Sequence, residues 1–409
     1  MKRTHIRATR LVATTAALGL ALTCGTAEAA AGKPSKEPQG SLTQYTLSPG
    51  LLKITGGRTA GNPTQVHGVL GMPKGKGPHP VVVVMHGAHP NCVTAGKTDA
   101  VVRKPVKAAW PLVCAAPGKK EKVGPDYLRQ DAGLSHVVEA LTRKGFVAVS
   151  IDVVSPEIWW GGETDPGKGY TDLVDAHLRL LADLNKGVNH GLRIPGLKGR
   201  IDTSRVGMVG HSRGGGYVLS QKAAQRKGLF GAVAIEPAEN VEKATHKVPV
   251  LNVRGACDED TGPEAGLATV KGLARSGRTK VAADVLLAGT GHAMLNTNLA
   301  PTDKDGGVGG CKRAKVAKPA AARAQVAQLT AAFLEQALHK AGTYRLPAVK
   351  GLAPKGGNLR KGGPVIGFRE ARQETFTDPL RIRESVSKER LLPAIPKGLK
   401  VNKVPDDGI

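Results

Sequence analysis

The stretch GMVGHSRGGG, residues 207–216, places one serine among glycines directly after an apolar run. The residues before it, 205–210, are typical of a buried strand, and residues 213–227 are typical of a helix. Residues 210–214 therefore fit the pattern G-x-S-x-G in the strand–turn–helix setting that this pattern requires. Because a Cβ on either flanking glycine would collide with the neighbouring strand or helix, we expect a strained turn with Ser212 at the bend. The alternative is an ordinary glycine-rich loop or an anion-binding turn.

Strands and helices alternate on both sides of this turn. The run VVVVM is continuously apolar, as in strands that are buried on both faces of a sheet. The alternation implies crossover connections and a mostly parallel sheet with helices on both faces, which is a doubly wound α/β architecture. Ligands of such sheets bind at the carboxyl ends of the strands. Two short strands are expected within 46–72, and the further strands are expected at 81–85, 146–152, 205–210, 231–237, 248–255 and the first part of 281–292. The expected helices cover 129–144, 171–186, 213–227 and 318–341.

The N-terminal residues have the pattern of a secretory signal peptide. A basic start, MKRTHIRATR, precedes the run LVATTAALGLALT, which is too short to span a bilayer, and the small residues Ala27 and Ala29 follow. We expect cleavage near Ala29 or Ala31 and a secreted protein. Cys24 raises the alternative of a lipid anchor, but Thr23 stands where a small Gly or Ala is expected.

Composition divides the whole chain into four parts. We expect a signal peptide at 1–31, a polar linker at 32–45, an α/β domain at 46–342 and a basic extension rich in Pro and Gly at 343–409. Within the extension, GPVIGFREA fits a strand and RIRESVSKERLL fits a short helix.

The chain is strongly basic. Its 409 residues carry a formal charge of +26 at pH 7. Such a charge favours anionic surroundings, for example cell-wall polymers, acidic lipids or acidic substrates. Aromatic residues make up only 3% of the chain and no nucleic-acid motif occurs, so we expect no specific nucleic-acid partner. The Cys and His spacing of zinc sites is also missing from the sequence, so we expect neither a metal nor another cofactor.

A nucleophilic serine needs a base and an orienting acid, and in this architecture they follow in the order Ser, Asp, His. The acid is expected just after the strand VPVLNVRG, where Asp258 has the commoner spacing and Asp260 is the alternative. His292 follows both acids, after the final strand and before the long terminal helix. We therefore expect Ser212, Asp258 and His292 to act together. His211 is expected to point away from the serine and to be packed or hydrogen-bonded.

Acyl chemistry at a serine also needs two backbone N–H donors for the oxyanion that forms. One donor is expected from Arg213, the residue after the serine. The other is expected from Ala88, in the loop HGAHPNC that follows the strand VVVVM. His86 and Gly87 shape the turn that presents it.

Four segments carry a resemblance to a known family. VVVVMHGAHPNC, GRIDTSRVGMVGHSRGGG, RGACDED and GTGHAMLNT resemble secreted bacterial α/β-hydrolases of the dienelactone hydrolase and cutinase-like group, including relatives of platelet-activating factor acetylhydrolase. They occur in the family's order within residues 46–342. The resemblance implies the α/β-hydrolase fold and ester hydrolysis by Ser212, His292 and Asp258.

Two positions depart from the polyester-degrading cutinases of this group. Those enzymes usually have an aromatic residue at the oxyanion position, where this chain has Ala88, and a Trp after the next strand, where it has IEPAEN. The low aromatic content also argues against an aromatic clamp for a polymer. Trp159 and Trp160, in the loop after SIDVV, are the best remaining candidates for a substrate wall, with simple packing as the alternative.

Four cysteines remain after cleavage of the signal peptide, and an even number in an exported chain indicates two disulfides. Three pairings are open. We favour Cys257–Cys311, because Cys257 adjoins the acid turn and Cys311 lies in the connection after His292. The pair Cys92–Cys114 would then close the irregular segment after the oxyanion loop.

Together these features predict a secreted serine hydrolase that cleaves small or lipid carboxylic esters through an acyl-enzyme. Acyl transfer or peptide cleavage by the same triad is the first alternative, because a triad does not define the acceptor. A non-catalytic, basic cell-surface binding protein on the same fold is the second.

Overall fold

The structure is a computed structural model that describes most of the predicted α/β domain. Trp159, Trp160, Cys92 and the predicted signal peptide lie outside the described residues. Among the helices in the described part of the chain, none is both long and apolar enough to cross a membrane. The described residues are 41–47, 66–88, 114–115, 123–124, 129–153, 166–194, 196–238, 245–279, 281–299, 311, 316–341, 343–345, 358–360 and 382–386.

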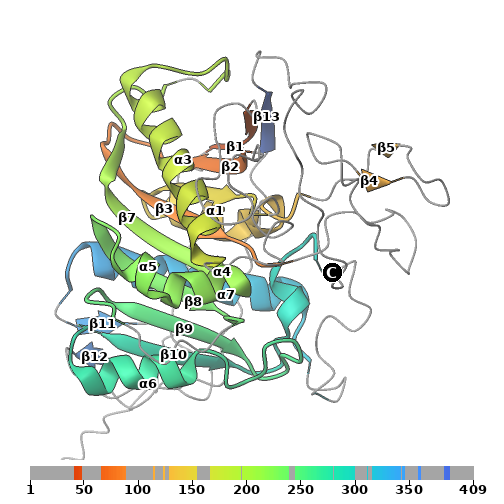
Figure 1. Cartoon of the computed structure of the whole chain (residues 1–409), viewed down its shortest axis with the longest axis vertical. Coiled ribbons are helices and arrows are strands. Elements are labelled where there is room, and N and C mark those ends of the chain that lie inside the picture. The colour runs from red at the N-terminus through yellow and green to blue at the C-terminus, as the bar shows by residue number, and fades with distance from the viewer. Residues whose placement is uncertain are drawn as a thin grey trace, which may run out of the picture. The chain divides into compact units, whose positions relative to one another are not determined.

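One nine-stranded sheet organises these residues, in the order β10-β9-β8-β7-β3-β6-β2-β1-β13 (Figure 1). Strand β2 is antiparallel to both of its neighbours, and the other strand pairs of this sheet are parallel. The prediction of a mostly parallel sheet is therefore confirmed. The strands are β1 (Ser41–Leu47), β2 (Val66–Met72), β3 (His79–Met85), β6 (Val147–Ile151), β7 (Ile201–His211), β8 (Leu229–Ile235), β9 (Val250–Gly255), β10 (Ala282–Leu287) and β13 (Ile382–Val386).

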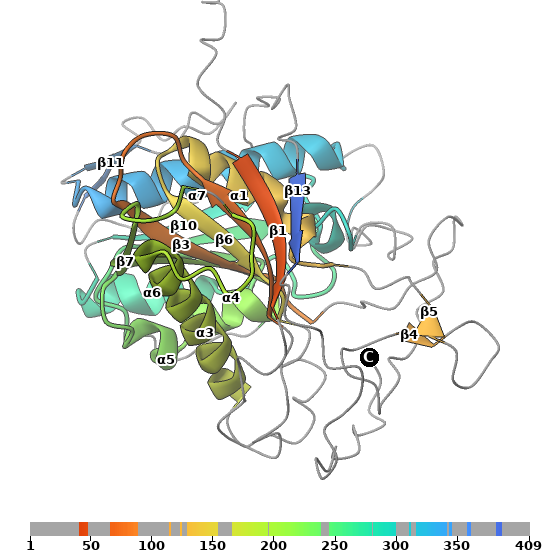
Figure 2. The same cartoon turned by 90° about the horizontal axis from the view of Figure 1, so that it is seen from above.

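Helices cover both faces of the sheet (Figure 2). In β3, Val82 and Val84 join a core with side chains of α1 and α7, whereas Val81 and Val83 join a second core with side chains of α3, α4 and α6. All four valines are fully buried, which explains why this strand is continuously apolar. The helices are α1 (Ser135–Arg143), α3 (Pro166–Lys186), α4 (Arg213–Leu219), α5 (Gln221–Ala224), α6 (Leu267–Ser276) and α7 (Pro319–Leu338).

Short elements complete the described part of the chain. Two of them are 3-10 helices, and the others pair as small two-stranded sheets, β4 with β5 and β11 with β12. The bounds are η3 (Ala132–Leu134), η4 (His292–Leu295), β4 (Cys114–Ala115), β5 (Val123–Gly124), β11 (Thr343–Arg345) and β12 (Asn358–Arg360).

Strand β1 begins inside the segment that was predicted to be a linker. Every residue of Ser41–Leu47 pairs with a residue of β2, and the side chains of Leu42 and Tyr45 are buried. The linker prediction is therefore wrong for residues 41–45. The two large apolar side chains stand among Ser, Thr and Gln, so the local pattern looks polar, and pairing with β2 decides the conformation.

Strand β13 corrects a second expectation. The segment RIRESVSKERLL was expected to form a short helix, but Ile382–Val386 is a strand that pairs in parallel with β1. A sheet edge offers unpaired backbone N–H and C=O groups, and a strand can satisfy them where a helix cannot. This long-range pairing is invisible to a local helical pattern.

The parallel strands bring five connections to one edge of the sheet. His86 and Gly87 follow β3, Ser212 follows β7, and Glu236 follows β8. The turn that contains Asp258 and Asp260 follows β9, and η4, which begins with His292, follows β10. Because the carboxyl ends of parallel strands lie at the same edge, this edge is where a site is expected.

Candidate active site

The turn at Ser212 is strained, and glycines make it possible. Ser212 has φ 57° and ψ −127°, a left-handed conformation that few non-glycine residues adopt, and its side chain is buried. A Cβ on Gly210 would overlap the carbonyl group of Gly214, and a Cβ on Gly214 would lie 2.5 Å from the carbonyl oxygen of His86. The predicted steric reason for both glycines is confirmed.

Backbone hydrogen bonds fix the strained turn in place. The N–H of Ser212 donates to the carbonyl of Ile235 on β8 at 3.0 Å. The carbonyl of Ser212 accepts from Gly216 and from Ala238, each at 3.0 Å. The serine is therefore held from the neighbouring strand as well as from the helix that follows it.

The turn after β3 lies directly against the serine. A Cβ on Gly87 would stand 2.7 Å from Oγ of Ser212 and 2.9 Å from the backbone nitrogen of Arg213. The missing side chain of Gly87 therefore leaves room beside the serine hydroxyl and the Arg213 N–H. Ala88, the next residue, is partly exposed.

His292 and Asp258 are in direct contact. Nδ1 of His292 lies 3.1 Å from Oδ2 of Asp258, and both side chains are buried. Since a carboxylate can only accept, Nδ1 donates the proton, and Nε2 is the acceptor nitrogen of the neutral ring. Thr261 also donates to Asp258, from its backbone nitrogen at 3.0 Å and from its hydroxyl at 2.6 Å.

These contacts shift the pKa of both partners. Burial alone would raise the pKa of Asp258, but the hydrogen bonds from His292 and Thr261 bring it below its ordinary value. Burial would lower the pKa of His292, but the hydrogen bond to Asp258 and the surrounding carboxyl groups raise it. An ionised Asp258 therefore faces an imidazole with an increased affinity for protons.

Asp260 lies at the opposite nitrogen of the same ring. Its Oδ2 is 3.2 Å from Nε2 of His292, and its side chain is 66% exposed. The two acids that the sequence left as alternatives thus contact different atoms of His292. His211 is buried at the end of β7, with its ring centre 4.5 Å from that of His292, and so connects the serine turn to this ring.

Glu236 was missed by the sequence analysis. It follows β8, is fully buried and has φ 44°. Its Oε2 lies 3.4 Å from Nε2 of His211 and 3.6 Å from Nδ1 of His292. Burial raises the pKa of Glu236 to about 8, although His292 opposes this shift. The available signal was an acid directly after a buried strand, in the sequence IEPAEN.

Donor atoms of His211, Glu236 and His292 all lie within 4.8 Å of one another. Two imidazoles and a carboxylate are donors that a divalent cation can use. The contact between Nδ1 of His292 and Asp258 already occupies this space, and a cation would compete with it. We therefore interpret the group as a buried cluster of neighbouring titratable side chains.

A disulfide ties the acid turn to the segment after η4. Cys257 and Cys311 are bonded, with their Cα atoms 5.3 Å apart, which confirms this predicted pair. Cys257 is fully buried next to Asp258. The pairing Cys92–Cys114 and a wall formed by the two adjacent tryptophans concern residues outside the described part of the chain and stay predictions.

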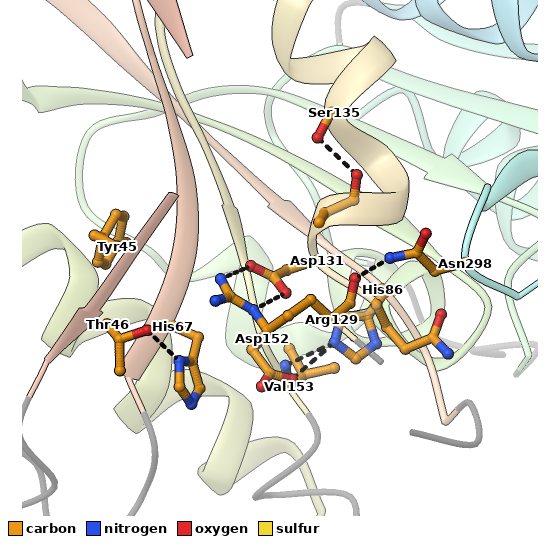
Figure 3. Close-up of polar contacts among 12 residues, drawn as sticks. Tyr45, Thr46, His67, His86, Arg129, Asp131, Ser135, Asp152, Val153 and Asn298 are labelled. Atoms are coloured by element: carbon orange, nitrogen blue, oxygen red, sulfur yellow. Dashed lines mark hydrogen bonds and ion pairs between the residues drawn. The ribbon is translucent and has the colours of Figure 1, made fainter. Parts of the chain in front are cut away.

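A second polar cluster supports the turn after β3 (Figure 3). Nε2 of His86 lies 3.2 Å from Oδ1 of Asp152 and 2.9 Å from the backbone nitrogen of Val153, at the end of β6. Nδ1 of His86 donates to the carbonyl of Gly87 at 2.8 Å. The imidazole thus joins the ends of β3 and β6 and holds the glycine that contacts the serine.

The segment before α1 anchors the segment that follows His292. Arg129 donates two hydrogen bonds to Asp131, at 2.8 and 2.5 Å (Figure 3). The carbonyl of Arg129 accepts from Nδ2 of Asn298 at 2.6 Å, and the carbonyl of Gln130 accepts from Nδ2 of Asn296 at 2.9 Å. These bonds fix the chain four to six residues beyond His292.

The strand order, the antiparallel second strand and the strained serine turn after β7 together define an α/β-hydrolase fold. No protein-family model matches the chain. Over 138 residues, 33% of this chain, it is 28% identical both to Cutinase 1 of Thermobifida cellulosilytica and to the cutinase of Thermobifida fusca (strain YX). The match covers 46% and 40% of those proteins, so the chain spans less than half the length of these relatives. The similarity supports a cutinase-like α/β-hydrolase relationship over a third of the chain.

Proposed function

We propose that the protein is a secreted serine hydrolase that cleaves carboxylic esters through an acyl-enzyme. The observation that carries the proposal is the 3.1 Å contact between His292 and Asp258, at the sheet edge that also holds the strained Ser212. The similarity to two cutinases favours an ester as the substrate. The positive charge of the chain favours an anionic cell-wall or membrane surface as its surroundings.

In the proposed reaction, Oγ of Ser212 attacks the ester carbonyl while Nε2 of His292 takes the hydroxyl proton. Asp258 orients the ring through Nδ1 and stabilises the imidazolium ion. The imidazolium then gives its proton to the leaving alcohol. Water, activated by the same ring, attacks the acyl group and releases Ser212.

The contacts support Asp258 rather than Asp260 as the acid of this triad. In a Ser-His-Asp triad the acid contacts Nδ1 and the serine uses Nε2. Asp258 contacts Nδ1, whereas Asp260 contacts Nε2, the nitrogen that must accept the proton of Ser212. Asp260 therefore competes with the serine for the same atom.

The protonation state of His292 decides whether the contact between Asp260 and Nε2 is favourable. When both ring nitrogens carry protons, they can donate to Asp258 and Asp260 together. When Nε2 loses its proton, two acceptors face each other and the contact to Asp260 becomes repulsive. The Asp260 side chain is 66% exposed, so we propose that it then turns into solvent and leaves Nε2 to Ser212.

The oxyanion donors are proposed to be the backbone N–H groups of Arg213 and Ala88. The space beside Gly87 supports this assignment, because it is bounded by Oγ of Ser212 and the nitrogen of Arg213. Removal of one oxyanion donor typically costs about 10²- to 10³-fold in kcat. A side chain at position 87 would fill the proposed oxyanion space.

Replacement of the serine tests the proposal. We expect Ser212→Ala to abolish hydrolysis of a p-nitrophenyl butyrate probe without loss of the folded state, measured by thermal unfolding. Ser204→Ala is the matched control, because Ser204 is exposed and lies toward the other end of the same strand. Turnover by the Ser212→Ala variant at the rate of the control would contradict the proposal. Transfer of the acyl group to an added alcohol would show that the protein is an acyltransferase. Cleavage of a peptide in place of the ester would show that its substrate is a peptide.

A further inference from the structure

Glu236 lies next to the proposed triad, at the edge of the sheet where β7, β8, β9 and β10 end. Its carboxyl group lies close to His211, at the end of β7, and to His292, in η4. The negative charges of Asp258 and Asp260, in the turn after β9, also act on it. Gly255 leaves the space that Glu236 occupies, since a Cβ at that position would overlap Oε1 of Glu236. The carboxyl group is therefore enclosed by titratable side chains on several sides.

The surroundings of Glu236 disfavour a negative charge. Within the described part of the chain neither carboxyl oxygen has a hydrogen-bond partner, and the side chain is fully buried. The hydroxyl of Thr261 contacts the backbone carbonyl of Glu236, at 3.4 Å, and not its carboxyl group. An ionised carboxylate without donors is costly to bury, and Asp258 already supplies one negative charge to His292.

Two carboxyl groups thus share one imidazole but have opposite environments. Asp258 accepts hydrogen bonds from His292 and Thr261, which stabilise its ionised form. Glu236 has the two imidazoles at 3.4 and 3.6 Å, and a proton on its carboxyl can be donated toward Nε2 of His211. When environments separate a pair of acids in this way, the two acids take different roles.

We propose that Glu236 is a positioning residue of this site, whose protonated carboxyl contacts one nitrogen of His211 and one of His292 and leaves Asp258 as the single negative charge on Nδ1. The inference rests on the proposed function. A neutral Glu236 contacts one nitrogen of each ring, while the two rings also contact each other, and it does not compete for the Nδ1 proton. The residue acts on Ser212 only through His292.

Ionisation of Glu236 changes the charge next to His292 and therefore the pH dependence of the activity. Below the pKa of about 8, Glu236 is neutral, and Asp258 carries the negative charge beside Nδ1 of His292. Above it, a second negative charge lies 3.6 Å from Nδ1 and stabilises the imidazolium ion of the transition state. We expect kcat/KM of the wild type to rise a second time near pH 8, by about threefold, because a more basic imidazole is a better general base.

The test is the pH profile of Glu236→Gln, which keeps the shape of the side chain but cannot ionise. We expect the acid limb, which reports His292, to keep its midpoint, and the second rise near pH 8 to vanish. The measurement is kcat/KM for p-nitrophenyl butyrate, corrected for spontaneous hydrolysis, together with the rate of labelling by a fluorophosphonate. Glu264→Gln is the matched control: its carboxylate is 77% exposed and 3.7 Å from Arg254, and both features of the profile should survive.

Three outcomes would overturn the proposal. A shift of the acid limb to lower pH in Glu236→Gln would show that Glu236 is ionised throughout. An equal loss at every pH would show a purely structural role. A wild-type profile without a second rise near pH 8 would also decide against it, and it needs no variant to fold. Absence of fluorophosphonate labelling in the wild type would instead reject the proposed function.

Discussion

The two nitrogens of the His292 ring have different surroundings: the partners of Nδ1 are buried, and the partner of Nε2 is exposed. On the Nδ1 side, Asp258 and Glu236 are buried, and the Cys257–Cys311 bond ties the Asp258 turn in place. On the Nε2 side the partner is Asp260, which is 66% exposed. The contacts on the buried side are enclosed by protein, whereas the exposed Asp260 is the side chain that we propose to give up its contact with Nε2. The role of proton acceptor that we propose for His292 needs this combination, because the orientation of the ring must persist while Nε2 changes its contact.

The largest effect is expected on the buried side, from Asp258→Asn. The amide can donate to Nδ1, so the ring adopts the wrong tautomer and Nε2 carries the proton. We expect kcat for a p-nitrophenyl ester to fall by about 10³- to 10⁴-fold, with little change in the unfolding midpoint. A loss below tenfold would mean that another group orients His292.

The sequence predicted the serine turn better than the acids, for a physical reason. The constraint on Gly210 and Gly214 is local, because a Cβ would strike atoms of the same turn or the adjacent strand. Asp258 and Asp260 are two residues apart on one turn, and they differ in their burial and in the nitrogen of His292 that each one contacts. No local pattern contains that information.

Glu236 and β13 were missed because their environment is built from distant segments. The neighbours of Glu236 come from the ends of β7, β9 and β10, and become neighbours only when the parallel sheet forms. Ile382–Val386 is a strand because the edge of β1 is available to it. The alternation of strands and helices, by contrast, repeats along the chain, so the α/β class was predictable.

A smaller effect, on stability, is expected from removal of the disulfide that ties the Asp258 turn. Cys257 and Cys311 are 54 residues apart, and closure of a loop of this length contributes about 4 kcal/mol in the chain-entropy model. The double variant Cys257→Ser/Cys311→Ser should lose much of this free energy of unfolding in urea titrations without reductant. An unchanged free energy of unfolding would show that packing alone holds the turn.

The smallest effect is expected on the exposed side, from Asp260→Ala. Asp260 raises the pKa of His292, so its removal lets the ring lose its proton at lower pH. The acid limb of kcat/KM should move to lower pH, and activity on that limb should rise by up to about threefold, as expected for an exposed charge pair. A loss of activity as large as that expected for Asp258→Asn would instead show that Asp260 is the acid that orients His292.

The central claim is that Ser212 is activated by His292 at this sheet edge. The most direct measurement is peptide mapping of the full chain after reaction with a fluorophosphonate, across a range of pH. The account predicts one adduct, on Ser212, whose rate of formation falls at low pH as His292 gains a proton. A folded protein that forms no adduct, or forms it on another serine at a rate independent of pH, would contradict the account.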